Sequence, residues 1–340
     1  MKRKAFLGSG LTLGLSFASI SKGVAEDRNE ELKVAKVPYL KPGDTIGITS
    51  PAGFISIADL QSAIFKMESW GFKVKVGSTP GRKHFTFGGT DDERLADLQA
   101  MLDDADIHAV MCARGGYGCN RIIDRLNFSR FIKHPKWIIG FSDISVLHAH
   151  INSRFHIPTI HSKMCNSFPD DWSKADETQI VTIDSIRRCL VGENLSYTAP
   201  FNPANRMGNV KGKLVGGNAI TLLGLEGTKS ELETKGKILF LEEVDEYPYA
   251  IDRFFITMKR NGKLAGLKAL VLGGFRMKKE TGNETFDARL EEIVMREVNE
   301  YSYPVCFDFP VGHQKNNMAL RCGMEHELSV TTNGTLLTSL

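Results

Sequence analysis

Apolar residues along the first half of the chain occur in short runs, separated by segments in which they recur at helical spacing. Residues 45–49 form an apolar run that ends in the turn Ser50-Pro51-Ala52-Gly53, and residues 57–70 show the spacing of a helix. Thr90 with Glu93 predicts a capping box. Further strands are predicted at 72–76, 109–113, 137–141 and 157–160, with Ser142 or Asp143 capping a helix after the third. This alternation predicts an α/β fold with a parallel sheet covered by helices.

The pattern weakens between residues 167 and 206, where Pro, Asp, Asn and Ser are frequent, and this segment is predicted to be a linker region. Strands and helices alternate again after it. The second set comprises strands at 212–215, 237–241 and 269–273, helices from 218, at 249–259 and at 286–298, and closing strands at 327–330 and 335–338. Asn333-Gly334 predicts a hairpin between the last two strands. We therefore expect an N-terminal α/β domain at 38–166 and a smaller C-terminal α/β domain at 207–340.

The first 25 residues differ from the rest of the chain. Lys2, Arg3 and Lys4 precede an apolar stretch of small residues, and Gly23-Val24-Ala25 fits a signal-peptidase site. The apolar stretch is shorter than the roughly 20 residues of a spanning helix. Residues 1–25 are therefore predicted to be a signal peptide, and we expect an exported, periplasmic protein with no stable membrane span after cleavage.

Composition narrows the class of protein further. The 340 residues are 42% hydrophobic and 24% charged, which is typical of a globular chain. The net charge of +3 becomes −1 without the predicted signal peptide, and no basic run predicts nucleic-acid binding. The six cysteines could form disulfides in an exported protein, although Cys112 and Cys306 lie in apolar runs typical of buried thiols. The sequence has no CxxC spacing of the kind that binds zinc, and we expect no metal or cofactor.

The segment from Ala113 to Arg121 is the first with the residues for chemistry. It follows a buried strand and carries Arg114, Gly115, Gly116 and Cys119 before apolar residues at helical spacing. A thiol at a strand-to-helix turn is exposed, and a helix N-terminus favours its anion. The amide of Asn120, with a glycine amide, could donate to an oxyanion. A glycine-rich phosphate loop and a plain tight turn remain open as alternatives.

Two later segments supply an acid and a base. Glu242 lies in an acidic cluster at the end of an apolar strand, where α/β sheets form their sites, although a solvated acidic loop has the same pattern. His313 follows a short apolar run and a glycine. The order Cys119, Glu242, His313 is that of nucleophile, acid and histidine in α/β-hydrolases. His148 and His150 are two residues apart on a predicted helix, do not share a face, and are predicted to be structural.

Several motifs over residues 38–330, taken in order, resemble the LD-carboxypeptidases, which include muramoyl-tetrapeptide carboxypeptidases and microcin-immunity peptidases. The motifs are Phe87-Gly88-Gly89-Thr90-Asp91 with Arg94, Arg114-Gly115-Gly116-Tyr117-Gly118, Gly140-Phe141-Ser142-Asp143, Gly216-Gly217-Asn218, Leu241-Glu242-Glu243 with Tyr249 and Asp252-Arg253, and Gly312-His313. The resemblance implies an active site between two α/β domains and a metal-independent Ser–Glu–His triad. It also implies release of terminal D-alanine from the L,D bond of a murein tetrapeptide.

The chain departs from the family pattern at two places. Cys119 stands where we place the family's serine, so the sequence predicts a cysteine nucleophile with Glu242 and His313. His161-Ser162 stands where many relatives have His-Gly-Pro, which affects the pocket wall and substrate choice. The expected partner is a peptidoglycan-derived peptide. A catalytically weak or inactive peptide-binding protein, or a protein binding an anionic cofactor at the glycine loop, is the alternative. Arg114 is a candidate for the substrate carboxylate or a brace for its loop, and the oligomeric state, a homodimer included, is open.

Overall fold

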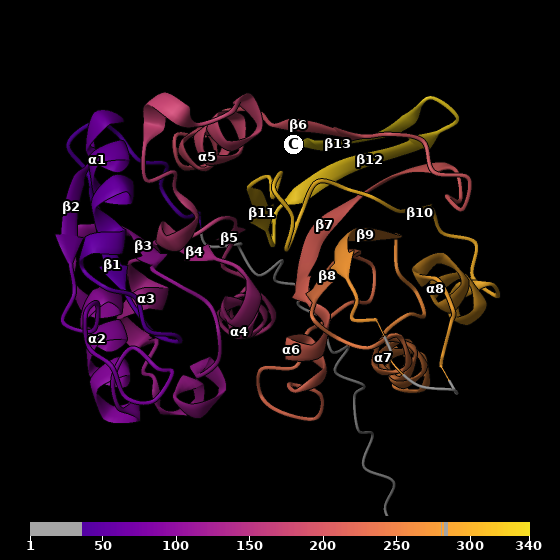
Figure 1. Cartoon of the computed structure of the whole chain (residues 1–340), viewed down its shortest axis with the longest axis horizontal. Coiled ribbons are helices and arrows are strands. Elements are labelled where there is room, and N and C mark those ends of the chain that lie inside the picture. The colour runs from indigo at the N-terminus through magenta and orange to yellow at the C-terminus, as the bar shows by residue number, and fades with distance from the viewer. Residues whose placement is uncertain (1–35, 280, 282–284) are drawn as a thin grey trace, which may run out of the picture. The chain divides into compact units, whose positions relative to one another are not determined.

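The computed structural model describes residues 36–279, 281 and 285–340. The predicted signal peptide at 1–25 lies outside the described residues. In the described part of the chain, the strands form a six-stranded and a seven-stranded sheet (Figure 1). This confirms the predicted α/β class.

The six-stranded sheet has the order β11-β5-β4-β3-β1-β2, and all its neighbouring strands are parallel except β11, which is antiparallel to β5. The inner parallel strands are nearly continuous apolar runs, as expected for strands buried on both faces, whereas the edge strand β2 is largely exposed. Its strands are β1 (Thr45–Thr49), β2 (Lys73–Val76), β3 (Ile107–Cys112), β4 (Trp137–Gly140), β5 (Thr159–His161) and β11 (Leu320–Cys322). Its helices are α1 (Gln61–Ser69), α2 (Asp91–Asp103), α3 (Ser129–Lys133) and α4 (Ser145–Phe155). β11 comes from the predicted C-terminal domain, so the chain returns to its first sheet.

The seven-stranded sheet has the order β10-β9-β8-β7-β12-β13-β6. The first four strands are parallel and the rest antiparallel, and the predicted hairpin at Asn333-Gly334 joins β12 to β13. The strands are β6 (Ser196–Ala199), β7 (Gly208–Asn218), β8 (Ile238–Val244), β9 (Ala269–Arg276), β10 (Val305–Cys306), β12 (Glu325–Thr331) and β13 (Gly334–Ser339). The helices are α6 (Ala219–Leu223), α7 (Pro248–Arg260) and α8 (Leu290–Val298).

The segment predicted to be a linker region, 167–206, contains a helix and a strand that the sequence pattern did not predict. It contains α5 (Glu177–Leu190), whose N-terminus has a capping box formed by Asp176 and Gln179, and then β6. Its helical apolar positions pack into the core, which gives the segment a buried face that a free linker lacks. The boundaries of the two predicted domains stay a prediction.

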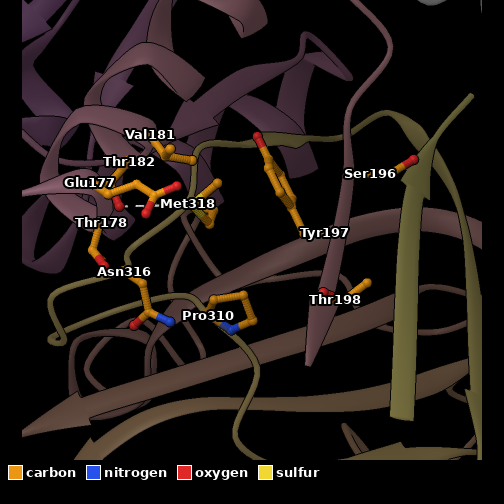
Figure 2. A pocket seen from close by; sticks show the side chains of 10 residues that line it. All are labelled: Glu177, Thr178, Val181, Thr182, Ser196, Tyr197, Thr198, Pro310, Asn316 and Met318. Atoms are coloured by element: carbon orange, nitrogen blue, oxygen red, sulfur yellow. Dashed lines mark hydrogen bonds between the residues drawn. The ribbon is translucent and has the colours of Figure 1, made fainter. Parts of the chain in front are cut away.

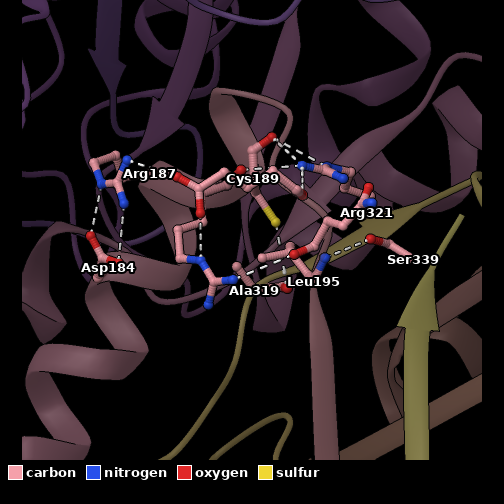
Figure 3. Close-up of polar contacts among 10 residues, drawn as sticks. Asp184, Arg187, Cys189, Leu195, Ala319, Arg321 and Ser339 are labelled. Carbon is pink, nitrogen blue, oxygen red and sulfur yellow. Dashed lines mark hydrogen bonds and ion pairs between the residues drawn. The ribbon is translucent and has the colours of Figure 1, made fainter.

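Arg321 on β11 fixes the end of α5 to the first sheet. Its buried guanidinium donates to the backbone carbonyl oxygens of Arg188, Cys189 and Glu193 (Figure 3). A cation near a helix C-terminus satisfies carbonyl groups that have no partner within the helix. This contact holds β11 against the end of α5 and the residues that follow it.

The two sheets also meet at α4, which lies between them (Figure 1). The amide of Asn218, the last residue of β7, donates to Ser145 Oγ at the start of α4 at 3.0 Å. A Cβ atom on Gly217 would lie 2.8 Å from Ser145 Cβ, and the backbone there has φ of 148°. Only glycine permits this approach, so the start of α4 is held against the end of β7.

Candidate active site

A carboxylate and an imidazole form a close pair at the carboxyl end of β8. Glu242 is fully buried and pairs in register with Asn218 of the neighbouring strand β7. Its Oε2 lies 2.5 Å from Nδ1 of His313, which follows β10 in a loop. The sequence prediction that these two residues share a site is consistent with this geometry. The carboxylate can fix the imidazole tautomer and leave Nε2 for proton transfer.

Gly312 allows this pair to form. Its φ is 96°, and a Cβ atom there would lie 2.6 Å from Glu242 Cγ. Its amide donates to Asn317 Oδ1 at 2.7 Å, which closes the loop around His313. The glycine is therefore required both for the backbone conformation and for the close approach to Glu242.

A second histidine lies on the other side of Glu242. His161, at the end of β5, is fully buried, and its Nε2 is 3.9 Å from Glu242 Oε1. Burial by itself raises the pKa of Glu242, but His161 and His313 outweigh that effect and lower the pKa to about 2. Glu242 is therefore ionised at neutral pH. Sequence reasoning noted His161 only as part of a departure from the family pattern and missed this contact.

Cys119 does not join this pair. Its side chain is fully buried, and its backbone amide donates to Asp143 Oδ2 at 2.8 Å. Within the described residues, no hydrogen bond or ion pair links Cys119 to His313 or Glu242. Burial, followed by the nearby Asp143 carboxylate, raises the pKa of the thiol well above its usual value. Cys119 is thus buried and forms no hydrogen bond with the pair, and its role as the nucleophile stays a prediction.

The local structure after the glycine loop differs from the prediction. The chain after the glycine loop forms two 3-10 turns, Cys119–Arg121 and Ile123–Arg125, where an amphipathic helix was predicted. Cys119 therefore has no α-helix N-terminus to stabilise a thiolate. The Asp143 side chain, predicted as a possible helix cap, accepts the Cys119 amide instead, and neither Ser142 nor Asp143 caps α4.

Ser142 lies next to a residue that contacts the acid–base pair. It lies on the turn between β4 and α4 with φ of 62°, a strained conformation for a residue other than glycine. The ring of Phe141, its neighbour, is 4.8 Å from the ring of His313. Ser142 Oγ has no hydrogen bond to any described residue and stays partly accessible. A strained serine on a strand-to-helix turn is the arrangement of a nucleophile elbow.

Of the four residues predicted to form the oxyanion and substrate loop, Gly115 packs against Ser142. A Cβ atom on Gly115 would lie 3.0 Å from Ser142 Cβ, so the loop packs directly on the serine. The amides of Gly115 and Gly116 have no hydrogen-bond acceptor among the described residues. Arg114 is exposed and donates to the Phe54 carbonyl at 3.0 Å, which braces the loop. The exposed Asn120 forms no hydrogen bond with Glu242 or His313.

The histidines of α4 and the cysteines lie in buried structural positions. His148 Nε2 lies 2.8 Å from the Gly140 carbonyl oxygen, and His150 Nδ1 lies 2.8 Å from Ser230 Oγ. All six cysteines are buried free thiols, so the possibility of disulfides is not realised in this structure. Among the described residues, no helix is long and apolar enough to cross a membrane.

A cavity of about 390 Å³ adjoins the loop that carries His313 (Figure 2). Its walls come from α5, β6 and the residues around Pro310, Asn316 and Met318. Glu242, His313 and Ser142 are not among the residues that line it. The cavity therefore adjoins the loop but does not contain the acid–base pair.

Known proteins share both halves of this architecture. Residues 46–162 match the LD-carboxypeptidase N-terminal domain and residues 211–328 the LD-carboxypeptidase C-terminal domain of the S66 peptidases. The chain belongs to the LD-carboxypeptidase family, and it is a peptidase, hence a hydrolase.

Particular relatives agree with this assignment. A probable murein peptide carboxypeptidase of Bacillus subtilis is 33% identical, with 85% of this chain and 89% of that protein aligned. The murein tetrapeptide carboxypeptidase of Pseudomonas aeruginosa is 29% identical, with 81% and 89% aligned. The crystal structure of a muramoyltetrapeptide carboxypeptidase from Oxalobacter formigenes superposes with a TM-score of 0.74 at 26% identity, covering 87% of this chain and 98% of that one.

Proposed function

We propose that this protein is a metal-independent LD-carboxypeptidase that releases the terminal D-alanine from the L,D bond of a murein tetrapeptide. The observation that carries the proposal is the strained, partly accessible Ser142, on a turn whose Phe141 contacts His313 of the Glu242–His313 pair. The names of the relatives support a murein peptide as substrate. Ser142 replaces Cys119 as the nucleophile in this proposal.

The proposed reaction proceeds by acyl transfer. Ser142 Oγ attacks the carbonyl carbon of the L,D bond while His313 Nε2 takes the hydroxyl proton. Glu242 holds Nδ1 and stabilises the imidazolium. The carbon–nitrogen bond then breaks, and His313 returns the proton to the leaving amine of D-alanine. Water, activated by His313, hydrolyses the acyl-serine ester and restores the enzyme.

The developing oxyanion needs hydrogen-bond donors near Ser142. The free amides of Gly115 and Gly116 are suitable because Gly115 packs on the serine. The amide that follows a nucleophile on such a turn, here that of Asp143, is the second expected donor. Each such donor contributes about 3 to 4 kcal/mol to the transition state. Asn120 is not included because it has no contact with the pair.

The test is release of D-alanine from L-Ala-D-Glu-meso-diaminopimelyl-D-Ala by the purified protein and by its Ser142→Ala and Cys119→Ala variants. We expect turnover by the wild type and by Cys119→Ala, and loss of at least about a thousandfold in Ser142→Ala. Binding of the peptide by the wild type without turnover would favour the peptide-binding alternative. Loss of turnover in Cys119→Ala alone, with normal folding, would restore the cysteine as nucleophile.

We also propose that the protein is exported and that residues 1–25 are removed. The support is the basic segment, the short apolar stretch and the small residues before Glu26. N-terminal sequencing of the protein from a periplasmic fraction should begin at Glu26. A cytoplasmic protein that retains Met1 would contradict this proposal.

A further inference from the structure

Lys163 places an ammonium group beside the proposed catalytic pair. It follows β5 and is half-buried, and its Nζ donates to the Gln314 carbonyl at 2.7 Å, one residue after His313. The same Nζ lies 5.7 Å from the centre of the Phe141 ring, which in turn contacts His313. The ammonium is thus close both to the turn of the proposed nucleophile and to the loop of the base.

This ammonium group has no carboxylate partner. Within residues 36–279, 281 and 285–340, no Asp or Glu oxygen lies within ion-pair distance of Lys163. Glu242 is the carboxylate that acts on it at longer range, and it is already paired with His313. One carbonyl acceptor leaves donors of the ammonium unused. By contrast, Lys315 in the same loop is exposed and forms an ion pair with Asp176.

Burial makes the missing counterion costly. It lowers the pKa of Lys163, against the opposing effect of Glu242, because the charged form has lost part of its hydration. Half-buried cations are normally compensated by an anion or by several hydrogen bonds. The site therefore gains most from a ligand that brings a negatively charged oxygen to Nζ.

We propose that Lys163 binds the free terminal carboxylate of the peptide, on the D-amino acid that leaves. The inference rests on the proposed carboxypeptidase function. An exopeptidase must distinguish a free C-terminus from an internal peptide bond, and the terminal carboxylate is one residue from the scissile carbonyl. Lys163 approaches from the side of His313, the group that protonates the leaving amine. Arg114, the candidate considered from sequence, is exposed and already donates to the Phe54 carbonyl.

Lys163 belongs to a segment in which the sequence departs from the family pattern. Ser162 and Lys163 follow His161, where the family pattern leads us to expect Gly and Pro. Neither of those residues carries a charge. The proposed anchor at Lys163 would favour a peptide that ends in a free acid.

The experiment compares L-Ala-D-Glu-meso-diaminopimelyl-D-Ala with the same peptide as its C-terminal amide. D-alanine or D-alaninamide release is measured for the wild type, Lys163→Met and Lys163→Gln, with Lys315→Met, on the loop that carries His313, as the matched control. Calorimetric affinities for both peptides are measured in the Ser142→Ala background, with and without Lys163→Met. Thermal unfolding checks that each variant is folded.

A charge-assisted hydrogen bond predicts that the wild type prefers the acid over the amide by about ten- to a hundredfold. The acid-to-amide ratio should fall to near one in both Lys163 variants and stay at the wild-type value in Lys315→Met. An unchanged ratio in folded Lys163→Met and Lys163→Gln, with D-alanine released normally, overturns this inference and leaves the proposed function intact. Absence of D-alanine release by the wild type overturns the proposed function, and the calorimetric ratio then still decides the role of Lys163.

Discussion

Replacing Gly312 by alanine tests whether the Glu242–His313 geometry supports activity. The alanine would adopt a φ of 96°, which costs about 1 to 2 kcal/mol for a residue other than glycine. Its Cβ would also lie 2.6 Å from Glu242 Cγ and 2.8 Å from Glu242 Oε2, so the carboxylate or the histidine loop must move. Overpacking of this kind adds about 1 to 3 kcal/mol.

The consequence for catalysis follows from the displacement. Misplacement of a catalytic group by about 1 Å can cost about a hundredfold in rate. We therefore expect Gly312→Ala to lower kcat/KM for D-alanine release by about a hundredfold and to lower the free energy of unfolding by about 2 to 5 kcal/mol. Peptide turnover and urea unfolding of the same preparation measure the two effects.

Gly262, which follows α7, provides the matched control. Its φ is 72°, and no atom lies within 4 Å of the position of an added Cβ. Gly262→Ala should therefore show the backbone cost alone, with full activity. If Gly312→Ala had the activity of Gly262→Ala and the same stability, the close packing of Gly312 against Glu242 would not matter for catalysis, and the reasoning would be refuted.

Three further predictions concern other parts of the molecule. Cys119→Ala should keep kcat/KM within about threefold, and iodoacetamide should label Cys119 only on unfolding, because burial keeps the thiol protonated; rapid labelling of the native protein would contradict this. The pKa of Glu242 is lowered from its usual 4.5 to about 2, so the ionised carboxylate should stabilise the fold by about 3 kcal/mol above pH 4.5 and lose that contribution as the pH falls towards 2. The unfolding free energies of wild type and Glu242→Gln should therefore converge near pH 2. A difference between these two free energies that does not depend on pH would count against the ionised pair. Arg321→Met should cost about 3 kcal/mol, measured by urea unfolding, because three carbonyl groups at and after the end of α5 lose their hydrogen bonds to the buried guanidinium; a stability equal to the wild type would show that the contact is dispensable.

The strands and their parallel arrangement could be predicted because buried strands of a parallel sheet are short apolar runs. The segment at 137–141 corresponds to β4, and Thr90 with Glu93 forms the predicted capping box. The helix α5 was missed because its apolar residues, such as Ile183 and Ile186, follow a stretch rich in polar residues and proline. The apolar spacing within 177–190 was the signal that could have revealed it.

The acid and base could be predicted from their positions after apolar strands, but the nucleophile could not be assigned in the same way. Cys119 and Ser142 both follow a buried strand, β3 and β4. Which of them reaches His313 depends on how the two sheets meet, and Ser145 contacts Asn218 where they do so. The side chain of Asp143, which accepts the Cys119 amide, is likewise a three-dimensional contact that spacing does not reveal.

The identity of the nucleophile is tested most directly by the site of covalent modification. The protein is treated with a serine-directed fluorophosphonate, and the adduct is located by peptide mass spectrometry while D-alanine release is followed. The account predicts one adduct, on Ser142, with loss of activity in proportion to labelling, and no adduct in His313→Ala. Complete inactivation with Ser142 unmodified, or full activity with Ser142 fully modified, would contradict it.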